Sequence, residues 1–428
     1  MDKPVLKIAL LGVGTVGGGV YKIIESQKAE FPYKVGAEIE VSKILVRNKE
    51  KYLDKPFADK LTDSWADIIT DECIDMVVEV MGGIEPAKTY ITEALKKGKH
   101  VVSANKDLMA QYGHELMSIA QENGCDLLFE AAVAGGIPII RPLRQCLAGN
   151  DITEVMGIIN GTTNFILTKM SEENMEFSDA LRLATDLGYA EADPTSDIEG
   201  YDAGRKLAIL ASLAFHAPVT FNDVFTEGIS KLSAKDIRYA HELGCEIKLL
   251  GIAKHTAEGI EVRVHPTMIP LKHPLATVKD AFNAVFVRGD AVGDTMFYGR
   301  GAGELPTGSA VVGDLIDVAR NMQFGCNGRI GAVSYKDILV KDMGETRSSY
   351  YIRMKLEDRA GTLAALAGLF GSNNVSISML LQKTKHGDNA EVVIVTYDVF
   401  ERQFMDSIMV ISNMSMVKEI SSIIRVYH

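Results

Sequence analysis

One stretch of the sequence gathers acidic side chains directly ahead of two bases. Residues 188–206 carry five carboxylates from Glu191 to Asp202 with no base among them, and Arg205 and Lys206 then begin an apolar-faced helical pattern. Asp202 and Lys206 are four residues apart, so they share one face of that helix. Carboxylates for an ammonium group, with lysines for a carboxylate and a reacting oxygen, suit a zwitterionic amino-acid substrate. Spacing alone supports equally well an acidic loop that caps a surface helix.

A second lysine follows a predicted strand. Residues 102–106 read Val-Ser-Ala-Asn-Lys and lie at the end of the strand-like run Lys99–Ser103. In open α/β sheets, ligands bind at the carboxyl ends of the strands. A lysine serves as a general acid or base when burial or a neighbouring cation lowers its pKa towards neutrality. If the fold brings Lys106 near Lys206, each lysine supplies that cation to the other, and we expect both to be catalytic.

A glycine motif stands near the start of the chain. Residues 12–17 read Gly-Val-Gly-Thr-Val-Gly, directly after the strand-like run Val5–Leu11 and at the start of a predicted helix, Thr15–Gln27. The first glycine permits a tight turn, the second lets a pyrophosphate approach the backbone, and the third packs the helix on the strand. Free N–H groups at the helix start bind phosphates. The motif predicts an NAD(P) site, whose nicotinamide carries the hydride while the protein supplies orientation and a proton.

The end of the second predicted strand distinguishes the two nicotinamide cofactors. An acidic residue there would bind the ribose 2′-hydroxyl of NAD, whereas an arginine accommodates the 2′-phosphate of NADP. Residues 44–46 lead into Arg47, Asn48 and Lys49 with no carboxylate. Arg47 therefore favours NADP, unless Arg47 and Lys49 are simply solvated loop charges.

Short apolar runs alternate with helical patterns over residues 1–140. After the first strand, strand-like runs are expected at Glu38–Val46, Asp75–Val80, Lys99–Ser103 and Leu127–Ala131. Strands that alternate with helices predict βαβ units and a parallel sheet. Residues 141–325 mix helices with strand-like stretches, residues 326–348 form a connector that contains glycine and charges, and residues 349–428 have their own periodicity.

Composition indicates a cytoplasmic protein. The 428 residues exceed one compact domain, are 47% hydrophobic and carry a net charge of −12 without a lysine or arginine cluster, so nucleic acid and anionic membrane are poor candidate partners. No run of 18 apolar residues is present, and nothing is expected to span a membrane. Five scattered cysteines without a C-x-x-C pair indicate reduced thiols, with no zinc site and no disulfide. They are Cys73, Cys125, Cys146, Cys245 and Cys326.

Residues 349–428 predict a separate βαββαβ unit, which is a ferredoxin-like order. Alternation over residues 350–357 predicts a half-buried first strand, with Tyr350 and Ile352 facing inward and Tyr351 and Arg353 facing outward. The later elements are expected at Thr362–Phe370 (helix), Val375–Gln382 and Ala390–Tyr397 (strands), Glu401–Ile411 (helix) and Val417–Val426 (strand).

The turn after that first strand has the features of a ligand site. Residues 358–363 read Asp-Arg-Ala-Gly-Thr-Leu, and Gly361 lets a small ligand approach N–H groups at a helix start, which suits an amino-acid carboxylate. The turn resembles that of ACT domains, which usually pair between subunits and bind a ligand at the junction. Asp358 and Gly361 are therefore the expected effector-binding residues, unless the domain serves dimerisation alone.

Four stretches of the chain resemble homoserine dehydrogenases, and with the final domain the similarity spans essentially the whole chain. They are residues 12–19, 102–106, 160–167 and 188–206. The second and third are far more specific than a dinucleotide fingerprint, and the last is close to the family's own signature. The resemblance implies NAD(P)H-dependent interconversion of L-aspartate 4-semialdehyde and L-homoserine, on the route to threonine, methionine and isoleucine. Because no aspartate-kinase segment precedes residue 1, we expect a monofunctional form.

The implied fold is α/β, with three domains and a linker. A Rossmann-type dinucleotide-binding domain is expected over residues 1–140, an α+β catalytic and dimerisation domain over 141–325, a linker over 326–348 and a ferredoxin-like ACT regulatory domain over 349–428. The last helix of the catalytic domain is expected to pack back on the Rossmann domain. Such enzymes are homo-oligomers, and a dimer or a tetramer is expected.

The resemblance also implies roles for individual residues. Lys206 resembles the family's proton donor, and Lys106 resembles its second active-site lysine. The implied substrate-binding residues are Glu191, Asp197, Asp202 and Lys206. A late glycine loop, residues 301–304, precedes the helical pattern Ala310–Arg320 and returns to the cofactor through Gly303. The expected cofactor-binding residues are Gly12, Val13, Gly14, Thr15, Val16, Gly17, Arg47, Ser103, Lys106 and Gly303.

Residues 129–138 resemble the family's monovalent-cation loop. One carboxylate plus backbone carbonyl groups suits a hard, singly charged ion, because too few charges are gathered for calcium. The implied metal-binding residues are Glu130, Val133, Gly135 and Ile137, and sodium is the expected ion. A plain strand-to-loop turn is the alternative. For the ACT domain, the logic of the implied pathway points to L-threonine as a feedback inhibitor.

Two other classes of protein stay open at this stage. A semialdehyde dehydrogenase with a cysteine nucleophile needs a reactive cysteine paired with a histidine, and Cys125 and Cys146 have no motif around them. An amino-acid-sensing regulator, built from a Rossmann unit and a ligand-binding tail, would show no turnover. The lysine-bearing motifs at residues 102–106 and 188–206 argue against that regulator.

Overall fold

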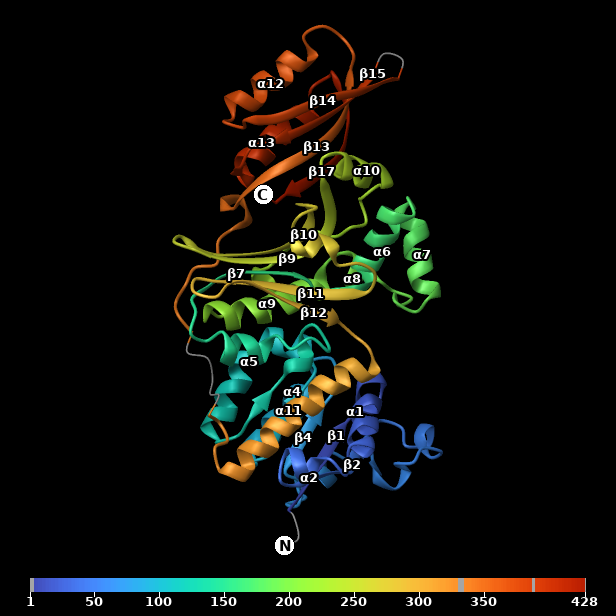
Figure 1. Ribbon diagram of the computed structural model, residues 1–428, viewed down its shortest axis with the longest axis vertical. Coiled ribbons are helices and arrows are strands. Elements are labelled where there is room, and N and C mark those ends of the chain that lie inside the picture. Colours follow the sequence, from blue (N-terminus) through green and yellow to red (C-terminus); the bar gives the residue numbers. More distant parts are fainter. Residues whose placement is uncertain (1–3, 330–334, 387–388, 428) are drawn as a thin grey trace. The chain divides into compact units, whose positions relative to one another are not determined.

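The computed structural model describes residues 4–329, 335–386 and 389–427 (Figure 1). These residues form two compact units. The first unit takes its described residues from Met1–Ile152, Arg205–Phe221 and Asn283–Asp337, and the second from Thr153–Gly204, Asn222–Phe282 and Ile338–His428. Residues 330–334 of the expected linker lie outside the described residues.

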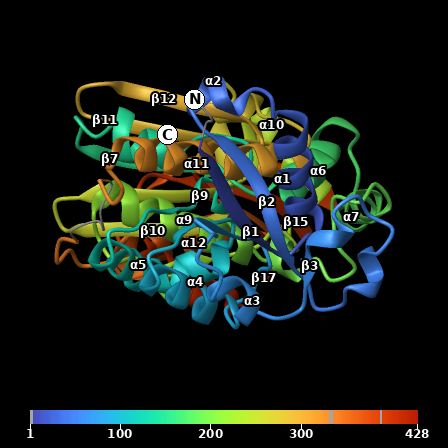
Figure 2. The same cartoon turned by 90° about the horizontal axis from the view of Figure 1, so that it is seen from below.

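The first unit contains the expected parallel sheet. Its strand order is β3-β2-β1-β4-β5-β6, and each neighbouring pair is parallel, as β1 and β2 illustrate (Figure 2). The strands are β1 (Val5–Leu11), β2 (Glu38–Leu45), β3 (Leu61–Thr62), β4 (Met76–Glu79), β5 (His100–Ser103) and β6 (Leu127–Leu128). This is a Rossmann-type order, and the order reverses between β1 and β4, where such sheets bind nucleotides.

The last strand of this sheet is shorter than predicted. The expected strand Leu127–Ala131 ends at Leu128, because residues 130–132 turn into a short 3-10 helix instead. Residues 130 and 131 are buried nevertheless. Their apolar setting resembles that of a strand, and the sequence pattern does not separate the two conformations.

Helices and a hairpin complete the first unit. The helices are α1 (Thr15–Ser26), α2 (Phe31–Lys34), α3 (Ala66–Ile69), α4 (Ala87–Lys96), α5 (Lys106–Glu122) and α11 (Glu304–Phe324), and the hairpin strands are β11 (Phe282–Gly289) and β12 (Gly293–Arg300). Helix α9 (Tyr201–Phe215) contributes its residues from Arg205 onward. Among the described residues, no helix is both long and apolar enough to cross a membrane. The five cysteines are free in the structure.

Helix α11 begins six residues before the predicted start at Ala310 and packs on α1. A Cβ at Gly308 would lie 2.9 Å from the carbonyl carbon of Gly19, so two glycines allow the two helices to touch. The apolar side chains of α11, such as Val311 and Leu315, belong to the core that also contains Val20 and Ile24 of α1. The late helix is thus part of the unit built around the parallel sheet.

The second unit is built on a largely antiparallel sheet. Seven of its strands follow each other in the order β7-β9-β10-β17-β13-β15-β14. The strands are β7 (Ile152–Ile158), β8 (Phe225–Thr226), β9 (Cys245–Thr256), β10 (Gly259–Pro270), β13 (Arg347–Glu357), β14 (Ile377–His386), β15 (Asn389–Thr396), β16 (Val399–Phe400) and β17 (Val417–Val426). The helices are α6 (Gly161–Glu172), α7 (Phe177–Asp186), α8 (Thr195–Ile198), α10 (Ala234–Glu242), α12 (Thr362–Ser372) and α13 (Glu401–Ser412).

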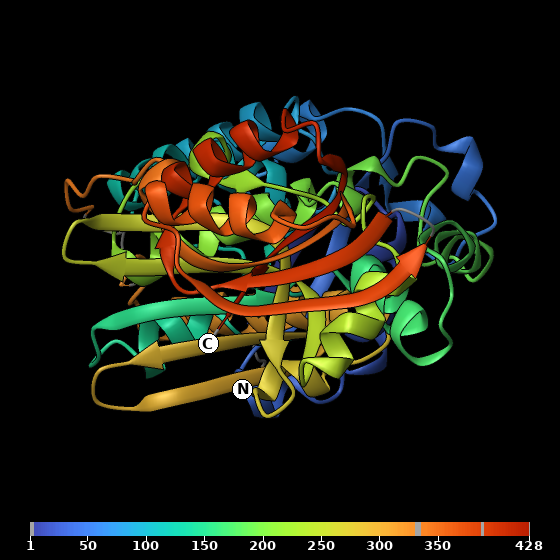
Figure 3. The ribbon, with the colours of Figure 1, turned by 90° about the horizontal axis from the view of Figure 1, so that it is seen from above.

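The C-terminal part of this unit has the predicted βαββαβ order. Helices α12 and α13 cover one face of its strands (Figure 3), where Leu366, Phe370 and Phe404 pack against Tyr350 and Ile352. The sheet does not stop at the end of this domain, because β17 continues it onto β10 through the parallel pairs Thr267–Arg425 and Met268–Val426.

The prediction of a half-buried β13 was wrong. Tyr351 and Arg353 were expected to face outward, yet they are 0% and 6% exposed. Helix α10 of the same unit covers that face, where the Arg353 guanidinium and the Tyr351 hydroxyl both donate to the buried Asp236 carboxylate. A bidentate ion pair satisfies a buried arginine, so a charged residue on a strand need not face solvent.

Candidate active site

The glycine motif shapes a cavity at the carboxyl ends of β1, β2 and β4. Gly12 has φ of +95° and turns the chain out of β1, while a Cβ at Gly17 would lie 2.3 Å from the Gly12 carbonyl oxygen. Around Gly14, which precedes α1, a Cβ would meet no atom within 4 Å. The first and third glycines are thus required by close packing, and the second leaves open space. A cavity of about 450 Å³ lies beside Gly12, Val13 and Gly14.

The late glycine loop reaches the helix that follows the motif. Gly303 has φ of +128° and caps α11, whose first residue is Glu304. A Cβ at Gly19 would lie 2.1 Å from the Glu304 carbonyl oxygen, and the Glu304 carboxylate accepts a hydrogen bond from Lys22 of α1 at 2.7 Å. The structure therefore brings the loop around Gly303 next to the first turns of α1, although Gly303 itself does not line the 450 Å³ cavity.

Basic residues border the same cavity beyond β2. Arg47 is exposed and lines the cavity together with Lys51. Lys49, the other base singled out in the sequence, pairs with Asp63 at 2.8 Å. Among the residues that line the cavity, Asp63 has the one carboxylate, and that carboxylate is engaged by Lys49.

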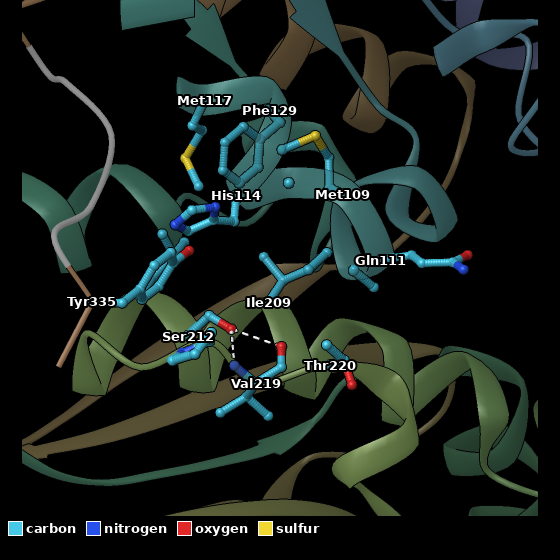
Figure 4. Close-up of a pocket in the computed structure, with 14 residues that line it drawn as sticks. Met109, Gln111, His114, Met117, Phe129, Ile209, Ser212, Val219, Thr220 and Tyr335 are labelled. Atoms are coloured by element: carbon cyan, nitrogen blue, oxygen red, sulfur yellow. Dashed lines mark hydrogen bonds between the residues drawn. The ribbon is translucent and has the colours of Figure 1, made fainter. Parts of the chain in front are cut away.

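The two lysine-bearing helix ends meet in the first unit. Lys106 is the first residue of α5, Lys206 lies in α9, and both lysines are half-buried. The residues beside them form an ion pair, because Arg205 Nε lies 3.0 Å from Asp107 Oδ1. Figure 4 shows Met109, His114 and Met117 of α5 opposite Ile209 and Ser212 of α9, around a small pocket of about 60 Å³.

Two of the three predicted substrate carboxylates lie together in the second unit. Asn160, at the start of α6, donates through Nδ2 to Asp197 at 2.7 Å and to Asp202 at 2.9 Å. Its Oδ1 accepts from the Thr163 N–H, so the amide orientation is fixed. Asp202 is 3% exposed. Glu191 lies in an exposed loop and takes no part in these two hydrogen bonds.

The sequence motif that contains Asn160 also holds a structural residue. Asn164, 1% exposed, donates to the carbonyl oxygens of Val278, Asp280 and Phe282 and accepts from Lys248. Sequence reasoning gave no role to Asn160 or Asn164. Two asparagines four residues apart at a helix start were the available signal, because asparagine is a strong helix N-cap.

Family models and known proteins match the chain over nearly its whole length. Residues 12–130 match the homoserine dehydrogenase NAD-binding domain, residues 138–316 match homoserine dehydrogenase, and residues 350–404 match the ACT domain. The homoserine dehydrogenase of Bacillus subtilis is 45% identical over 98% of both chains, and that of Corynebacterium glutamicum is 46% identical over 98% of this chain and 95% of its own.

The chain belongs to the homoserine dehydrogenase family.

Solved structures agree with this assignment. A homoserine dehydrogenase from Thiobacillus denitrificans has a TM-score of 0.94 and 43% identity, and the match covers 100% of this chain and 99% of that one. A hyperthermophilic archaeal homoserine dehydrogenase in complex with NADPH has a TM-score of 0.63 and 29% identity over 73% of this chain and 97% of its own. The chain is thus an NAD(P)-dependent oxidoreductase, and the readings as a cysteine-dependent semialdehyde dehydrogenase or a non-catalytic regulator are set aside.

In the predicted cation loop of this dehydrogenase, the Glu130 carboxylate already accepts hydrogen bonds from the backbone. Glu130 is 5% exposed, and its two carboxylate oxygens accept hydrogen bonds from the N–H groups of Ile139, Ile140 and Arg141. Its own N–H donates to Asp314, whose pKa is raised to about 7 by burial and by the Glu130 carboxylate. Gly135 has φ of +54°, and a Cβ there would lie 2.3 Å from the Gly301 carbonyl oxygen, so this loop abuts the late glycine loop.

The ACT domain of the enzyme has a cavity at its predicted effector turn. About 210 Å³ is enclosed by residues 356–364 together with Gln382, Ala390 and Val392. Gly361 has φ of +90° and precedes α12, and Gln382 Nε2 donates to Asp358 Oδ1 at 3.3 Å. Thr362 is 4% exposed, and within the described chain its hydroxyl has no hydrogen-bond partner. Both predicted effector residues thus border one cavity.

Proposed function

We propose that this enzyme interconverts L-aspartate 4-semialdehyde and L-homoserine with Lys206 as the proton donor and Lys106 as the second active-site lysine. The observation that carries this assignment is the 3.0 Å ion pair between Asp107 and Arg205, which ties together the helix turns on which the two lysines stand. A lysine ammonium group can donate the proton of this reaction, and a second lysine can hold the reacting oxygen.

In the reducing direction, the Lys206 ammonium donates its proton to the carbonyl oxygen of the semialdehyde as a hydride adds to the carbon. Lys106 holds that oxygen by a hydrogen bond and compensates the negative charge that develops on it. When bound, the nicotinamide cofactor supplies the hydride. The reverse reaction returns the hydroxyl proton to neutral Lys206. Asp197, Asp202 and Glu191 are assigned to the substrate ammonium group, and the shared hydrogen bonds to Asn160 support the first two.

The cofactor assignment favours NADP(H). Gly12 to Gly17, Ser103, Lys106 and Gly303 are its proposed binding residues, and the exposed Arg47 beside the cavity suits a 2′-phosphate. The lone carboxylate of the cavity lining, Asp63, already pairs with Lys49 and is a poor partner for a ribose hydroxyl. The solved archaeal relative in complex with NADPH agrees with this assignment.

A sodium ion is proposed in the loop of Glu130, Val133, Gly135 and Ile137. Because three backbone N–H groups already occupy the Glu130 carboxylate, the ligands would be main-chain carbonyl oxygens of these residues. Carbonyl oxygens suit a hard, singly charged ion. Replacing sodium by choline in the assay should lower activity, and adding sodium back should restore it; equal rates in both salts would remove the ion from the assignment.

L-Threonine is the proposed inhibitor, bound in the 210 Å³ cavity of the ACT domain. N–H groups at a helix start such as that of α12 suit the threonine carboxylate, and the unpartnered Thr362 hydroxyl is a further donor or acceptor. Inhibition from this site requires that threonine bind the less active state better, and substrate must then weaken threonine binding. We further propose that the enzyme acts in the cytoplasm, in threonine, methionine and isoleucine synthesis, as a dimer or tetramer.

One assay tests both activity and regulation: NADPH oxidation with L-aspartate 4-semialdehyde, with and without threonine. Thr362→Val should raise the threonine concentration for half inhibition about tenfold, the value of one lost hydrogen bond, and leave the uninhibited rate unchanged. Ser372→Ala at the far end of α12 is the matched control and should behave as wild type. If millimolar threonine inhibits neither wild type nor variant, the regulatory assignment fails while the dehydrogenase assignment stands.

A further inference from the structure

A buried carboxylate that none of the sequence motifs contains lies at the end of β4. Glu79 is the last residue of that strand and is 0% exposed. Its strand partners are Leu11, the residue before the glycine motif, and Ser103, three residues before Lys106. Glu79 therefore stands at the carboxyl edge of the sheet, between the strand that leads to the cofactor cavity and the strand that leads to an active-site lysine.

One carboxylate oxygen of Glu79 holds the wall of the cofactor cavity. Oε1 accepts the N–H groups of Met81 at 2.9 Å and of Gly82 at 3.2 Å. Both residues line the 450 Å³ cavity. Since Gly82 and Gly83 both have positive φ, this short loop depends on such contacts to keep its path.

The other oxygen holds the turn in front of Lys106. Oε2 accepts the Ser103 hydroxyl at 2.7 Å, and Ser103 Oγ in turn accepts the Asn105 N–H at 3.1 Å. Asn105 caps α5 by accepting the Leu108 N–H, and its Nδ2 donates to the Gly83 carbonyl oxygen at 2.6 Å and to Glu79 Oε1 at 3.5 Å. The hydrogen bonds of Asn105 thus fix the backbone position of Lys106, the next residue.

This arrangement is costly for stability. Within the described chain, every hydrogen bond that Glu79 accepts comes from a neutral group, and burial raises the pKa of its carboxyl while these hydrogen bonds oppose the rise. A buried carboxylate without a cation stabilises a fold poorly. Glu79 lowers stability and lies at the sheet edge where such folds bind ligands. A destabilising group in that place indicates a functional role.

We propose that Glu79 is a positioning residue, which keeps Lys106 in register with the cofactor cavity through the Ser103–Asn105 turn and the Met81–Gly82 loop. Glu79 does not touch the reacting atoms and acts through Lys106, so this inference rests on the proposed role of that lysine. Hydride and proton transfer need their groups placed within a few tenths of an ångström, and a displaced group costs up to about 100-fold in rate.

The test uses Glu79→Gln in the full-length enzyme. The amide oxygen can still accept the Met81 and Gly82 N–H groups, which directs the new NH₂ group towards Ser103 and disturbs the turn before Lys106. We expect kcat to fall by about 10- to 100-fold, while the Kd for NADPH, measured by fluorescence titration, changes by less than about threefold. A wild-type kcat, or a loss confined to NADPH affinity, overturns the proposal.

Two comparisons separate positioning from simple damage. In the double variant Glu79→Gln/Lys106→Ala, the rate should be no lower than in Lys106→Ala alone, because both changes act through one lysine; multiplicative losses overturn the proposal. Asp126→Asn is the matched control, since Asp126 is 4% exposed and accepts hydrogen bonds from Asn321, Asn327 and Gly328 before β6, at the opposite edge of the sheet. It should lower Tm with kcat unchanged, and an equal loss of kcat there overturns the positioning role.

The remaining outcomes are also decisive. If Glu79→Gln does not fold, Ser103→Ala breaks the same link while the carboxylate stays in place, and kcat should fall in the same direction; a wild-type kcat in Ser103→Ala then overturns the proposal. If Lys106→Ala alone keeps wild-type turnover, the assignment of Lys106 fails, and that result is separate from the behaviour of Glu79.

Discussion

The sheets of the two units differ in where they keep buried charge. In the parallel sheet of the first unit, Glu79, Lys99 and Asp126 are buried and lie at strand ends or just beyond them, and no charged side chain in the middle of a described strand of this sheet is buried. In the sheet of the second unit, Arg353 and Lys248 lie within β13 and β9. A parallel sheet covered on both faces leaves only its edges for polar groups.

Charge inside the sheet of the second unit joins its elements to each other. Asp236 of α10, 0% exposed, accepts Arg353 at 2.8 and 3.1 Å and also closes the capping box of its own helix with Ser233. Glu391 of β15 accepts from Lys235 and Tyr239 of the same helix. We therefore expect Glu79, at the carboxyl edge of the first unit's sheet, to govern rate, and the charges inside the second unit's sheet to govern stability.

The largest expected effect on rate is that of Lys206→Ala in the first unit. Turnover should fall by about 10² to 10⁴, the range for general acid–base groups, with NADPH affinity and thermal stability nearly unchanged. Steady-state kinetics and a fluorescence titration measure the two quantities. Retention of wild-type turnover would exclude Lys206 as the proton donor.

For the second unit, Arg353→Met should lower the free energy of unfolding by about 3–5 kcal/mol, because the Asp236 carboxylate is left buried without its cation. Urea unfolding followed by circular dichroism measures it. Adding Asp236→Asn, which keeps a capping side chain on α10, should recover part of the loss. If Arg353→Met lowers kcat per folded molecule and leaves stability unaffected, the expected difference between the two sheets is wrong.

A pH dependence is expected from Lys248, which is 2% exposed and whose hydrogen-bond acceptors are the neutral oxygens of Asn164 and Val278. Burial lowers its pKa to about 8, whereas in the unfolded chain it titrates near 10.5. Between these values the unfolded chain binds more protons, so stability should rise with pH by up to about 3 kcal/mol and show no contribution to the slope below pH 8. Lys248→Met should remove this part of the slope; identical pH profiles for wild type and variant contradict the assignment.

The smallest change is expected from Arg47, an exposed charge. Arg47→Asp should weaken NADPH binding by about tenfold or less and leave NADH binding unaffected, because exposed charge pairs are worth up to about 1 kcal/mol and the substitution also introduces repulsion. Initial rates with both cofactors give the selectivity. Equal or better efficiency of the parent enzyme with NADH would show that Arg47 does not discriminate.

Local patterns predicted most elements because their causes are local. The first strand, Val5–Leu11, and the last, Val417–Val426, begin and end as predicted. The start of α11 was missed, because the helical pattern was expected only from Ala310 and the helix begins at Glu304. In the structure Pro306 lies in the first turn, where no N–H donor is needed, and Gly308 is the contact with α1.

The sequence predicted those site residues that belong to recognisable motifs. Glu79 stands in none, and its partners at the Lys106 turn lie 24 and 26 residues away. The pairing of Arg353 with Asp236 spans 117 residues, so alternation along β13 alone predicted an outward charge. A single acid at the end of an apolar strand is the signal that would have drawn attention to Glu79.

Through the pairing of β17 with β10, the ACT domain covers the end of a strand whose neighbouring residues pair with β8. β17 pairs with β10 at Thr267 and Met268, Tyr427 donates to the Met268 carbonyl oxygen, and Arg425 of the same strand pairs with Glu227. A chain ended before β13 would expose these backbone groups beside a strand that is buried along nearly its whole length, and such edges seed aggregation. Loss of the ACT domain in this enzyme should therefore appear first as insolubility.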